Sequence, residues 1–307
     1  MPGSYSSGLD LESTPACKMS GMNTRALGQT NVSAIGLGAM PMSVAGHMPD
    51  EEQSIRTVHA ALDAGITLID TADAYTPSHD QVGHNERLIA KALATYGGDT
   101  GDVLVATKGG HTRVPRGGWD IDGRPDYLVE ACERSLKALG VEAIGLYQHH
   151  RPDPAVPYEE TIGALKTLLD AGKIRMAGIS NADPAQIRLA HEILGGRLAS
   201  VQNEYSPRFR SSEPEIDVCA ELGIAFLPWS PLGGMSNAGA LGDKHAVFAQ
   251  VGAARGVSAQ QVCLAWELAR SPVVIPIPGA SRPESIIDSV AAADLVLTSE
   301  ELATLPS

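Results

Sequence analysis

The chain has 307 residues, of which 43% are hydrophobic, and its 36 acidic residues outnumber 23 Lys plus Arg to leave a net charge of −13. This acid excess argues against a protein that binds nucleic acid or an anionic membrane, because both partners are recognised through clustered basic residues. The four cysteines lie far apart without CxxC spacing, so the sequence encodes neither a zinc knuckle nor a disulfide framework, and we expect a protein of the reducing cytoplasm.

The amino-terminal segment differs in composition from the rest of the chain. Residues 1–22 are rich in Ser, Gly and Pro and lack the charged start and apolar stretch of a signal peptide, so we expect a disordered extension. No later run reaches the ~18 apolar residues that a membrane span needs. We expect residues 23–307 to form a single domain, which begins with a β-hairpin over 24–32.

Short apolar runs then alternate with amphipathic stretches. The eight candidate strands begin at Ser33, Ile66, Asp102, Ala143, Ile174, Ala199, Ile224 and Val273. Helical periodicity follows several of them, with Gly65 and Gly140 as helix ends and Asp183 followed by Pro184 as a helix start. Strands that are apolar on both faces, each followed by a helix, indicate a parallel sheet covered by helices.

Eight such units predict an α/β protein, a (β/α)8 TIM barrel capped by the N-terminal hairpin and carrying extra C-terminal helices. Two helical patterns, 243–255 and 258–269, separate the last two strands and lie outside the repeat. A doubly wound dinucleotide fold is the competing architecture, but the G-x-G at Gly36 does not continue into the required G-x-G-x-x-G.

Polar residues follow the strands, where the active site of a parallel barrel lies. Asp70 and Lys108 end consecutive strands, so an ion pair between them is expected, with the Tyr75 hydroxyl close to the ammonium. A cation about 4 Å from a phenol stabilises the phenolate by about 4 kcal/mol at an intermediate dielectric. We therefore expect the pKa of Tyr75 to fall from about 10 toward neutrality, which would make Tyr75 an efficient general acid.

Seven motifs in order complete this pattern. They are GITLIDTADAY, ATKGG, LYQHHRPDP, GISN, VQNEYSP, PWSPLGG and IPIPGASR. As a set they resemble the aldo-keto reductase family from about residue 24 to residue 305. The resemblance implies that Asp70, Tyr75, Lys108 and His150 reduce an aldehyde or ketone, a small-molecule carbonyl substrate, with NADPH and without a metal.

The histidine of this tetrad has to be chosen between two neighbours. His149 and His150 point to opposite faces of a strand. The family pattern has His directly before Arg, which matches His150 and Arg151. We expect His149 to be an outward-facing core residue with its hydrogen bonds satisfied.

The resemblance also assigns cofactor contacts. The side chains of Ser180, Asn181 and Gln202 would bind the nicotinamide carboxamide, and Trp229 would stack on the nicotinamide ring. The remaining expected contacts are Ser230, Pro231 and Leu232 at the pyrophosphate, Gly279, Ser281 and Arg282 at the adenosine 2′-phosphate, and Asp288 at the adenosine. Ser289 and Ser285 replace the Asn and the Arg or Gln of many members, so the preference for NADPH over NADH rests mostly on Arg282, and NADH stays possible.

The substrate and its surroundings are less constrained. We expect the pocket to be lined by Met40, Met42, the loop 76–82 and the loop 109–125 with Trp119. Because these residues are partly apolar and partly polar, they do not show whether the substrate is a sugar, an aryl aldehyde or a small ketone. Oligomeric state is equally open. Two other functions stay open: a redox-sensing regulatory subunit like the potassium-channel β subunits, with little turnover, and a pyridoxal-phosphate enzyme with Lys108 as Schiff base.

Overall fold

The structure is a computed structural model that describes residues 23–44, 46 and 48–306; the expected extension at 1–22 lies outside the described residues. The strands are β1 (Thr24–Leu27), β2 (Thr30–Ser33), β3 (Leu37–Gly38), β4 (Leu68–Asp70), β5 (Leu104–Gly109), β6 (His111–Arg113), β7 (Trp119–Ile121), β8 (Ile144–His149), β9 (Ile174–Ser180), β10 (Leu198–Gln202) and β11 (Ala225–Phe226). The helices are α1 (Glu51–Asp63), α2 (His84–Thr95), α3 (Pro125–Leu139), α4 (Tyr158–Asp170), α5 (Pro184–Ile193), α6 (Glu213–Leu222), α7 (Leu241–Lys244), α8 (Ala246–Arg255), α9 (Ala259–Arg270), α10 (Pro283–Val290) and α11 (Ser299–Thr304).

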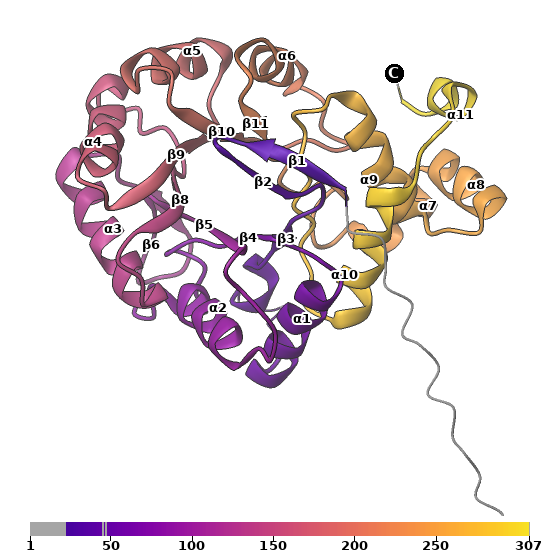
Figure 1. Cartoon of the computed structure of the whole chain (residues 1–307), viewed down its shortest axis with the longest axis horizontal. Coiled ribbons are helices and arrows are strands. Elements are labelled where there is room, and N and C mark those ends of the chain that lie inside the picture. Colours follow the sequence, from indigo (N-terminus) through magenta and orange to yellow (C-terminus); the bar gives the residue numbers. More distant parts are fainter. Residues whose placement is uncertain (1–22, 45, 47, 307) are drawn as a thin grey trace, which may run out of the picture.

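A parallel sheet curls into a barrel with the helices as an outer ring (Figure 1). Within the described part of the chain, seven strands join it in the order β11-β10-β9-β8-β5-β4-β3. The order along the sheet follows the order along the chain, as expected when each strand is followed by a helix that crosses to the next strand. The predicted (β/α)8 architecture is confirmed.

The eighth predicted strand, 273–277, forms no continuous ladder. A bridge joins Val274 to β11 and a second bridge joins Gly279 to β3, so this segment closes the barrel between the two edge strands. Pro276 and Pro278 have no backbone N–H and cannot donate to a ladder. Their carbonyl oxygens still accept hydrogen bonds from β3 and the residues before it, at 2.9 and 3.0 Å.

The N-terminal hairpin closes one end of the barrel, as predicted. β1 and β2 pair antiparallel, and the turn between them uses Gly28 at a φ of +55°. Leu27 and Val32 are buried and belong to the same apolar cluster as Leu68 and Leu146 of the sheet. Because these side chains fill the amino end of the barrel, the opposite end is left for a site.

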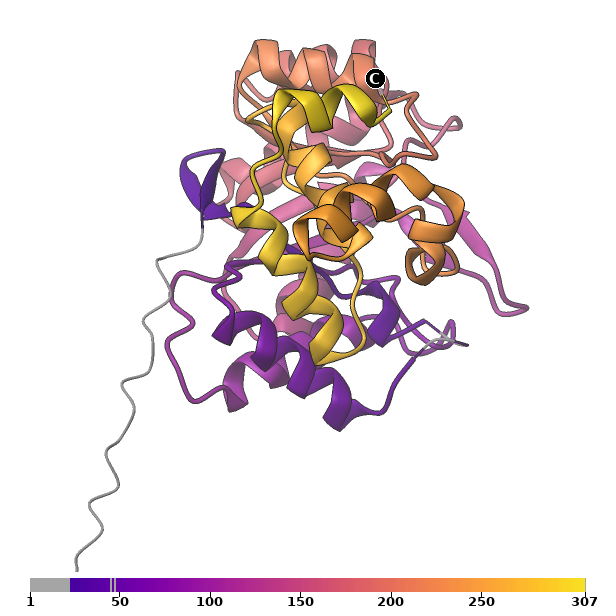
Figure 2. The same ribbon diagram turned by 90° about the vertical axis from the view of Figure 1, so that its right-hand side faces the viewer.

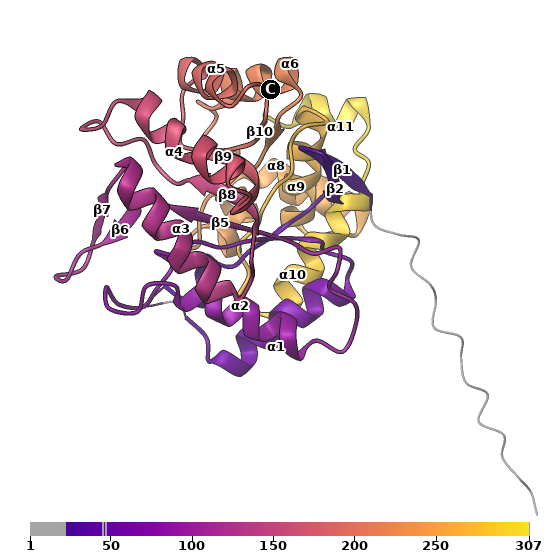
Figure 3. The same ribbon diagram turned by 60° about the vertical axis from the view of Figure 1, so that its left-hand side comes forward.

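A second hairpin lies at that opposite end (Figures 2 and 3). β6 and β7 pair antiparallel within the stretch 109–125, which was expected to be a loop. The turn between them contains Gly117 and Gly118, both with positive φ. The hairpin extends the wall of the barrel mouth beyond the end of β5.

The helix boundaries follow the predicted start and stop signals. α3 ends at Gly140, whose φ of +69° is the left-handed cap that favours glycine. α5 begins at Asp183, which forms a capping box with Gln186. The pattern 243–255 is broken at His245 into α7 and α8, while α9 matches the pattern 258–269. Among the described helices, none has the length and apolar character needed to cross a membrane.

Candidate active site

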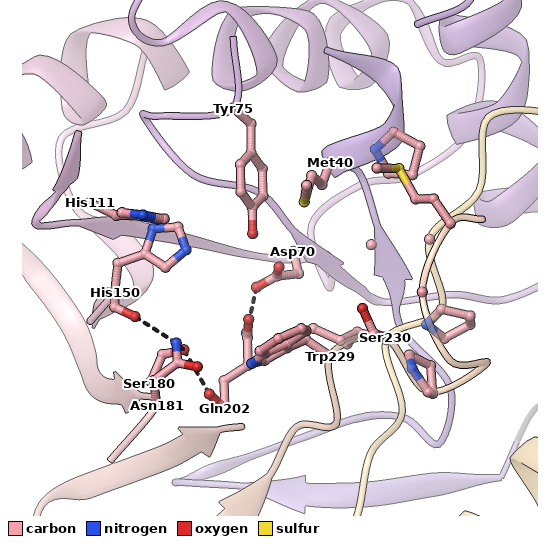
Figure 4. Close-up of a pocket in the computed structure, with 18 of the residues that line it drawn as sticks. Met40, Asp70, Tyr75, His111, His150, Ser180, Asn181, Gln202, Trp229 and Ser230 are labelled. Atoms are coloured by element: carbon pink, nitrogen blue, oxygen red, sulfur yellow. Dashed lines mark hydrogen bonds between the residues drawn. The ribbon is translucent and has the colours of Figure 1, made fainter. Parts of the chain in front are cut away.

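The open end of the barrel holds a cavity of about 550 Å³ (Figure 4). Most of the predicted site residues share its wall: Asp70, Tyr75, His150, Ser180, Asn181, Gln202, Trp229, Ser230, Pro231, Leu232 and Gly279. Lys108 lies directly behind this wall and is fully buried. Residues that lie up to 209 positions apart in the chain therefore meet because the carboxyl ends of parallel strands open at one rim.

The Lys108 ammonium uses each of its three protons. Nζ donates to Asp70 Oδ1 at 2.6 Å, to the Thr71 carbonyl at 2.8 Å and to Tyr75 Oη at 3.1 Å. β4 and β5 are neighbours in the sheet, which brings Asp70 and Lys108 together as predicted. Since the Tyr75 oxygen accepts a hydrogen bond from the ammonium, its own O–H proton is free to be donated into the cavity.

The expected acidification of Tyr75 is wrong. Burial raises the pKa of Tyr75 above its ordinary value and outweighs the lowering effect of the Lys108 charge, and the Asp70 carboxylate raises it further. An isolated ammonium would lower the pKa of Tyr75, but Asp70 neutralises much of the charge of Lys108. Tyr75 is consequently protonated at neutral pH, which is the form that can donate a proton.

Lys108 stays charged at the same time. Burial alone would lower its pKa, but Asp70 and Tyr75 together raise the pKa of Lys108 above the ordinary value. An ammonium held by three acceptors is a poor nucleophile, which counts against the Schiff-base hypothesis. Asp70 is held in turn, since its Oδ2 accepts a hydrogen bond from Gln202 Nε2 at 2.8 Å.

His150 faces the cavity beside Tyr75, as the register of the motif predicts (Figure 4). Its ring stands edge-on to the Tyr75 ring, with centroids 5.7 Å apart. Burial, then the positive charge of Lys108, holds the pKa of His150 well below its ordinary value. The imidazole is therefore neutral and carries a single N–H.

His149 is completely buried, but the expectation that its hydrogen bonds are satisfied is wrong. Neither ring nitrogen has a hydrogen-bond partner among the described residues. The nearest aromatic ring is that of Tyr158 on α4, with centroids 6.0 Å apart, so the imidazole packs as an apolar group. Burial lowers the pKa of His149 to about 4.

This shift predicts a loss of stability in mild acid. Below pH 6.5 His149 binds a proton in the unfolded chain but stays neutral in the folded chain. The free energy of unfolding therefore falls as the pH falls from about 6.5 to 4. For His149 the loss is about 2 kcal/mol between pH 6.5 and 5. We expect His149→Leu to remove this part of the pH dependence in chemical denaturation, and His79→Leu, at an exposed position, to retain it. If the free energy of unfolding fell equally steeply with pH in His149→Leu and in the unmodified protein, the expectation would be contradicted.

A cluster of polar side chains forms the floor of the cavity beside His150 (Figure 4). Asn181 Nδ2 donates to the His150 carbonyl at 3.0 Å and to Ser180 Oγ at 2.9 Å. The Ser180 hydroxyl donates to the Gln202 carbonyl at 2.6 Å. Asn181 has a φ of +58°, which a non-glycine residue adopts only when its surroundings hold it there. These bonds leave Asn181 Oδ1 and Gln202 Oε1 without a donor from the described residues.

The opposite wall is formed by the segment after β11. Trp229 faces the cavity from below Tyr75 in Figure 4, and its Nε1 has no partner among the described residues. Ser230 follows with a φ of +53°. Pro231 and Leu232 complete this wall. A flat aromatic face therefore lies across the cavity from the Tyr75 hydroxyl.

Three predicted cofactor residues lie outside the cavity. Arg282 is exposed and precedes α10, and the neighbouring Ser281 carbonyl accepts a hydrogen bond from Gln53 Nε2 at 2.8 Å. Both carboxylate oxygens of Asp288 accept hydrogen bonds at the start of α9, from Ser258 at 2.8 Å and Gln261 at 2.6 Å. Their roles stay predictions.

The substrate side of the cavity differs in part from the expectation. Met40 and Trp119 line it, whereas Met42 is buried away from it and none of the loop 76–82 contributes. His111 lies within the predicted loop 109–125, although it was not named individually. Its ring stacks on that of Trp119 with centroids 4.4 Å apart and stands edge-on to the His150 ring with centroids 4.9 Å apart.

Arg151 was missed as a lining residue, although its position two residues after the end of β8 was a usable signal. The described residues include no group of three or more His, Cys, Asp or Glu side chains arranged to hold a metal ion. The polar groups that line the cavity are a phenol, two imidazoles, two amides, two hydroxyls, two indoles, one carboxylate and one guanidinium.

Comparisons with known proteins identify relatives of this chain. The model of the aldo/keto reductase family matches residues 34–307. An uncharacterized oxidoreductase from Schizosaccharomyces pombe is 34% identical over 282 residues, which cover 91% of this chain and 87% of that protein. A glycerol dehydrogenase from Gluconobacter oxydans has a similar structure, with a TM-score of 0.76, 28% identity, and coverage of 91% and 92% of the two chains. An aldo/keto reductase from Klebsiella pneumoniae, solved with NADP and acetate, has a TM-score of 0.75, 29% identity, and coverage of 92% and 93%.

Fold and site together define an oxidoreductase built on a (β/α)8 barrel. The chain belongs to the aldo/keto reductase family, whose members in general reduce carbonyl groups with NAD(P)H. The family resemblance predicted from the motifs is confirmed.

Proposed function

We propose that this protein reduces an aldehyde or ketone to the alcohol with NADPH, and that Tyr75 is the general acid. The observation that carries the proposal is the Tyr75 hydroxyl, which accepts a hydrogen bond from the buried Lys108 ammonium and faces the cavity with its proton available. A family relative from Klebsiella pneumoniae was solved with NADPH, which supports the choice of cofactor.

The polar cluster fits a nicotinamide. A primary carboxamide offers two N–H groups and one carbonyl oxygen. Asn181 Oδ1 and Gln202 Oε1 are acceptors without a donor from the described residues, and the Trp229 face can pack against the flat ring. When bound there, the reduced nicotinamide supplies the two electrons and the hydrogen for the carbonyl carbon. Ser180 and Asn181 would bind its amide, and Ser230 to Leu232 would border the pyrophosphate.

The protein's own residues handle the carbonyl oxygen. Tyr75 O–H and the neutral His150 N–H are both donors at the cavity wall, so they can bind and orient this oxygen. As the oxygen gains negative charge, the Tyr75 proton moves to it. Lys108 then stabilises the phenolate that remains, and Asp70 holds Lys108 in place. A positioned acid of this kind contributes about 10² to 10⁴ in rate.

A spectrophotometric screen tests the proposal. We expect the purified protein to oxidise NADPH with at least one member of a panel of aldehydes, ketones and aldoses. Absence of turnover with the whole panel would count against it. Tight NADPH binding without turnover would favour the regulatory-subunit hypothesis.

Cofactor preference depends on Arg282 in this proposal. The exposed guanidinium precedes the N-terminus of α10, where backbone N–H groups already favour an anion. Loss of a hydrogen bond to a charged group costs about 1.5–3 kcal/mol, so we expect Arg282→Ala to raise the KM for NADPH by about 10-fold or more. The KM for NADH, which lacks the 2′-phosphate, should stay within about 2-fold. Equal changes in the KM for NADPH and the KM for NADH would show that Arg282 does not bind the 2′-phosphate.

A further inference from the structure

The charges that face the cavity are unevenly balanced. Asp70 and Arg151 are the charged side chains in the described wall. Asp70 is neutralised by Lys108 at 2.6 Å. His111 and His150 are neutral, because burial lowers the pKa of His111 to about 4 and the pKa of His150 well below its ordinary value. The guanidinium of Arg151 is thus the one uncompensated charge on this wall, in a protein whose net charge is −13.

Arg151 has no acceptor from the described residues. No carboxylate among them lies within 4.0 Å of its guanidinium, and its Nε is buried without a hydrogen-bond partner. The nearby Asp153 is already used, since its two oxygens accept the backbone N–H groups of Gly123 and Ala155 at 2.9 and 2.8 Å. Glu204 is close enough for the charge of Arg151 to affect it, but it forms no ion pair with Arg151. A guanidinium left without acceptors in a partly buried wall favours binding of an external anion.

The position of Arg151 separates this charge from the expected phosphate contacts. Arg151 directly follows β8 and His150, whereas Ser230 to Leu232 follow β11. β9 and β10 lie between these two strands in the sheet. The guanidinium is consequently on the side of Tyr75 and His150, where the substrate carbonyl is proposed to bind. The same cavity is also lined by the apolar side chains of Trp119 and Ile121.

We propose that Arg151 binds an anionic group on the substrate, so that this enzyme reduces an aldehyde or ketone with a carboxylate or phosphate attached to a partly apolar body. The inference rests on the proposed carbonyl reduction and names its substrate class. Arg151 acts here as a specificity-determining residue. It donates to the anion while Tyr75 and His150 bind the carbonyl oxygen of the same molecule.

The test compares pairs of substrates in which one member carries an anionic group and the other is neutral. We measure kcat/KM with NADPH for 4-formylbenzoate against 4-formylbenzamide, and for glyceraldehyde 3-phosphate against glyceraldehyde. The expected result is that the unmodified protein prefers the anionic member of at least one pair by about 10-fold or more. The pair that shows the preference tells whether the anion is a carboxylate or a phosphate.

Variants then assign the preference to the residue. Arg151→Gln should reduce the ratio of kcat/KM values by about 10- to 100-fold, mainly through KM, and Arg151→Lys should keep part of it. Arg208→Gln is the matched control, because Arg208 is an exposed arginine near Glu204 that lies outside the cavity wall, and it should leave the ratio unchanged. If Glu204→Gln reproduced the loss, Arg151 would act by balancing Glu204 and the inference would be overturned. It would be overturned equally by an unmodified protein with no preference for either anion.

A binding measurement separates this inference from the proposed function. Titration calorimetry in the presence of NADP measures the Kd of the protein for 4-(hydroxymethyl)benzoate and for inorganic phosphate. For whichever anion binds, the Kd should rise about 10-fold or more in Arg151→Gln. Turnover of neutral carbonyls with no Arg151-dependent anion binding would refute the anionic substrate class alone. Arg151-dependent anion binding without reduction of any carbonyl would refute the proposed function and leave the anion site standing.

Discussion

Tyr75→Phe should lower kcat for carbonyl reduction by about 10² to 10⁴ and leave the Kd for NADPH within about 2-fold. The ring that contacts His150 is retained, and only the hydroxyl that accepts from Lys108 at 3.1 Å is removed. Lys108 keeps its hydrogen bonds to Asp70 and the Thr71 carbonyl, so the free energy of unfolding should change by about 1 kcal/mol or less. Steady-state kinetics and fluorescence titration with NADPH measure the two constants.

The control removes a comparable hydroxyl elsewhere. The Tyr158 hydroxyl is buried without a partner among the described residues and does not line the cavity. Tyr158→Phe should therefore retain kcat within about 2-fold. If Tyr75→Phe kept a kcat close to that of Tyr158→Phe, another group would have to supply the proton, and the assignment of Tyr75 would fail.

The contact between Asp70 and Lys108 was predictable because it follows from topology alone. Both residues end strands that are consecutive in the chain, and consecutive strands of this fold are neighbours in the sheet. Alternation along a strand showed only that His149 and His150 face opposite sides, and the family motif, with His directly before Arg, then selected His150. Most residues of the candidate site could therefore be predicted from their positions at the ends of strands.

What could not be predicted depends on burial and on long-range partners. The pKa of Tyr75 is set by the balance between burial and two opposite charges, and the extent of burial cannot be read from the sequence. The unpaired state of Arg151 depends on where Asp153 and Glu204 direct their carboxylates. The segment 273–277 has the composition of a strand, but Pro276 and the following Pro278 lack the donors that a ladder requires.

Lys108→Met should abolish activity and also destabilise the fold, because it leaves the Asp70 carboxylate buried without its cation. Lys108 is fully buried and Asp70 is 3% exposed. Removal of one partner of such a pair costs about 3–5 kcal/mol, which corresponds to a fall in Tm of about 6 to 20 °C. By contrast, Lys173→Met breaks a half-exposed pair with Glu133 at 3.0 Å and should cost about 1 kcal/mol or less. Thermal unfolding followed by circular dichroism compares the two variants.

The double variant Asp70→Asn/Lys108→Met separates the structural role of the pair from its chemical role. With both charges removed, the amide at position 70 can still accept a hydrogen bond from Gln202, so most of the lost stability should return. Activity should not return, since no cation then faces the Tyr75 hydroxyl to stabilise the phenolate that forms when the proton leaves. A double variant as active as the unmodified protein would mean that the ion pair serves only the fold. A double variant as unstable as Lys108→Met would mean that packing of the lysine side chain, and not the uncompensated carboxylate, accounts for the loss of stability.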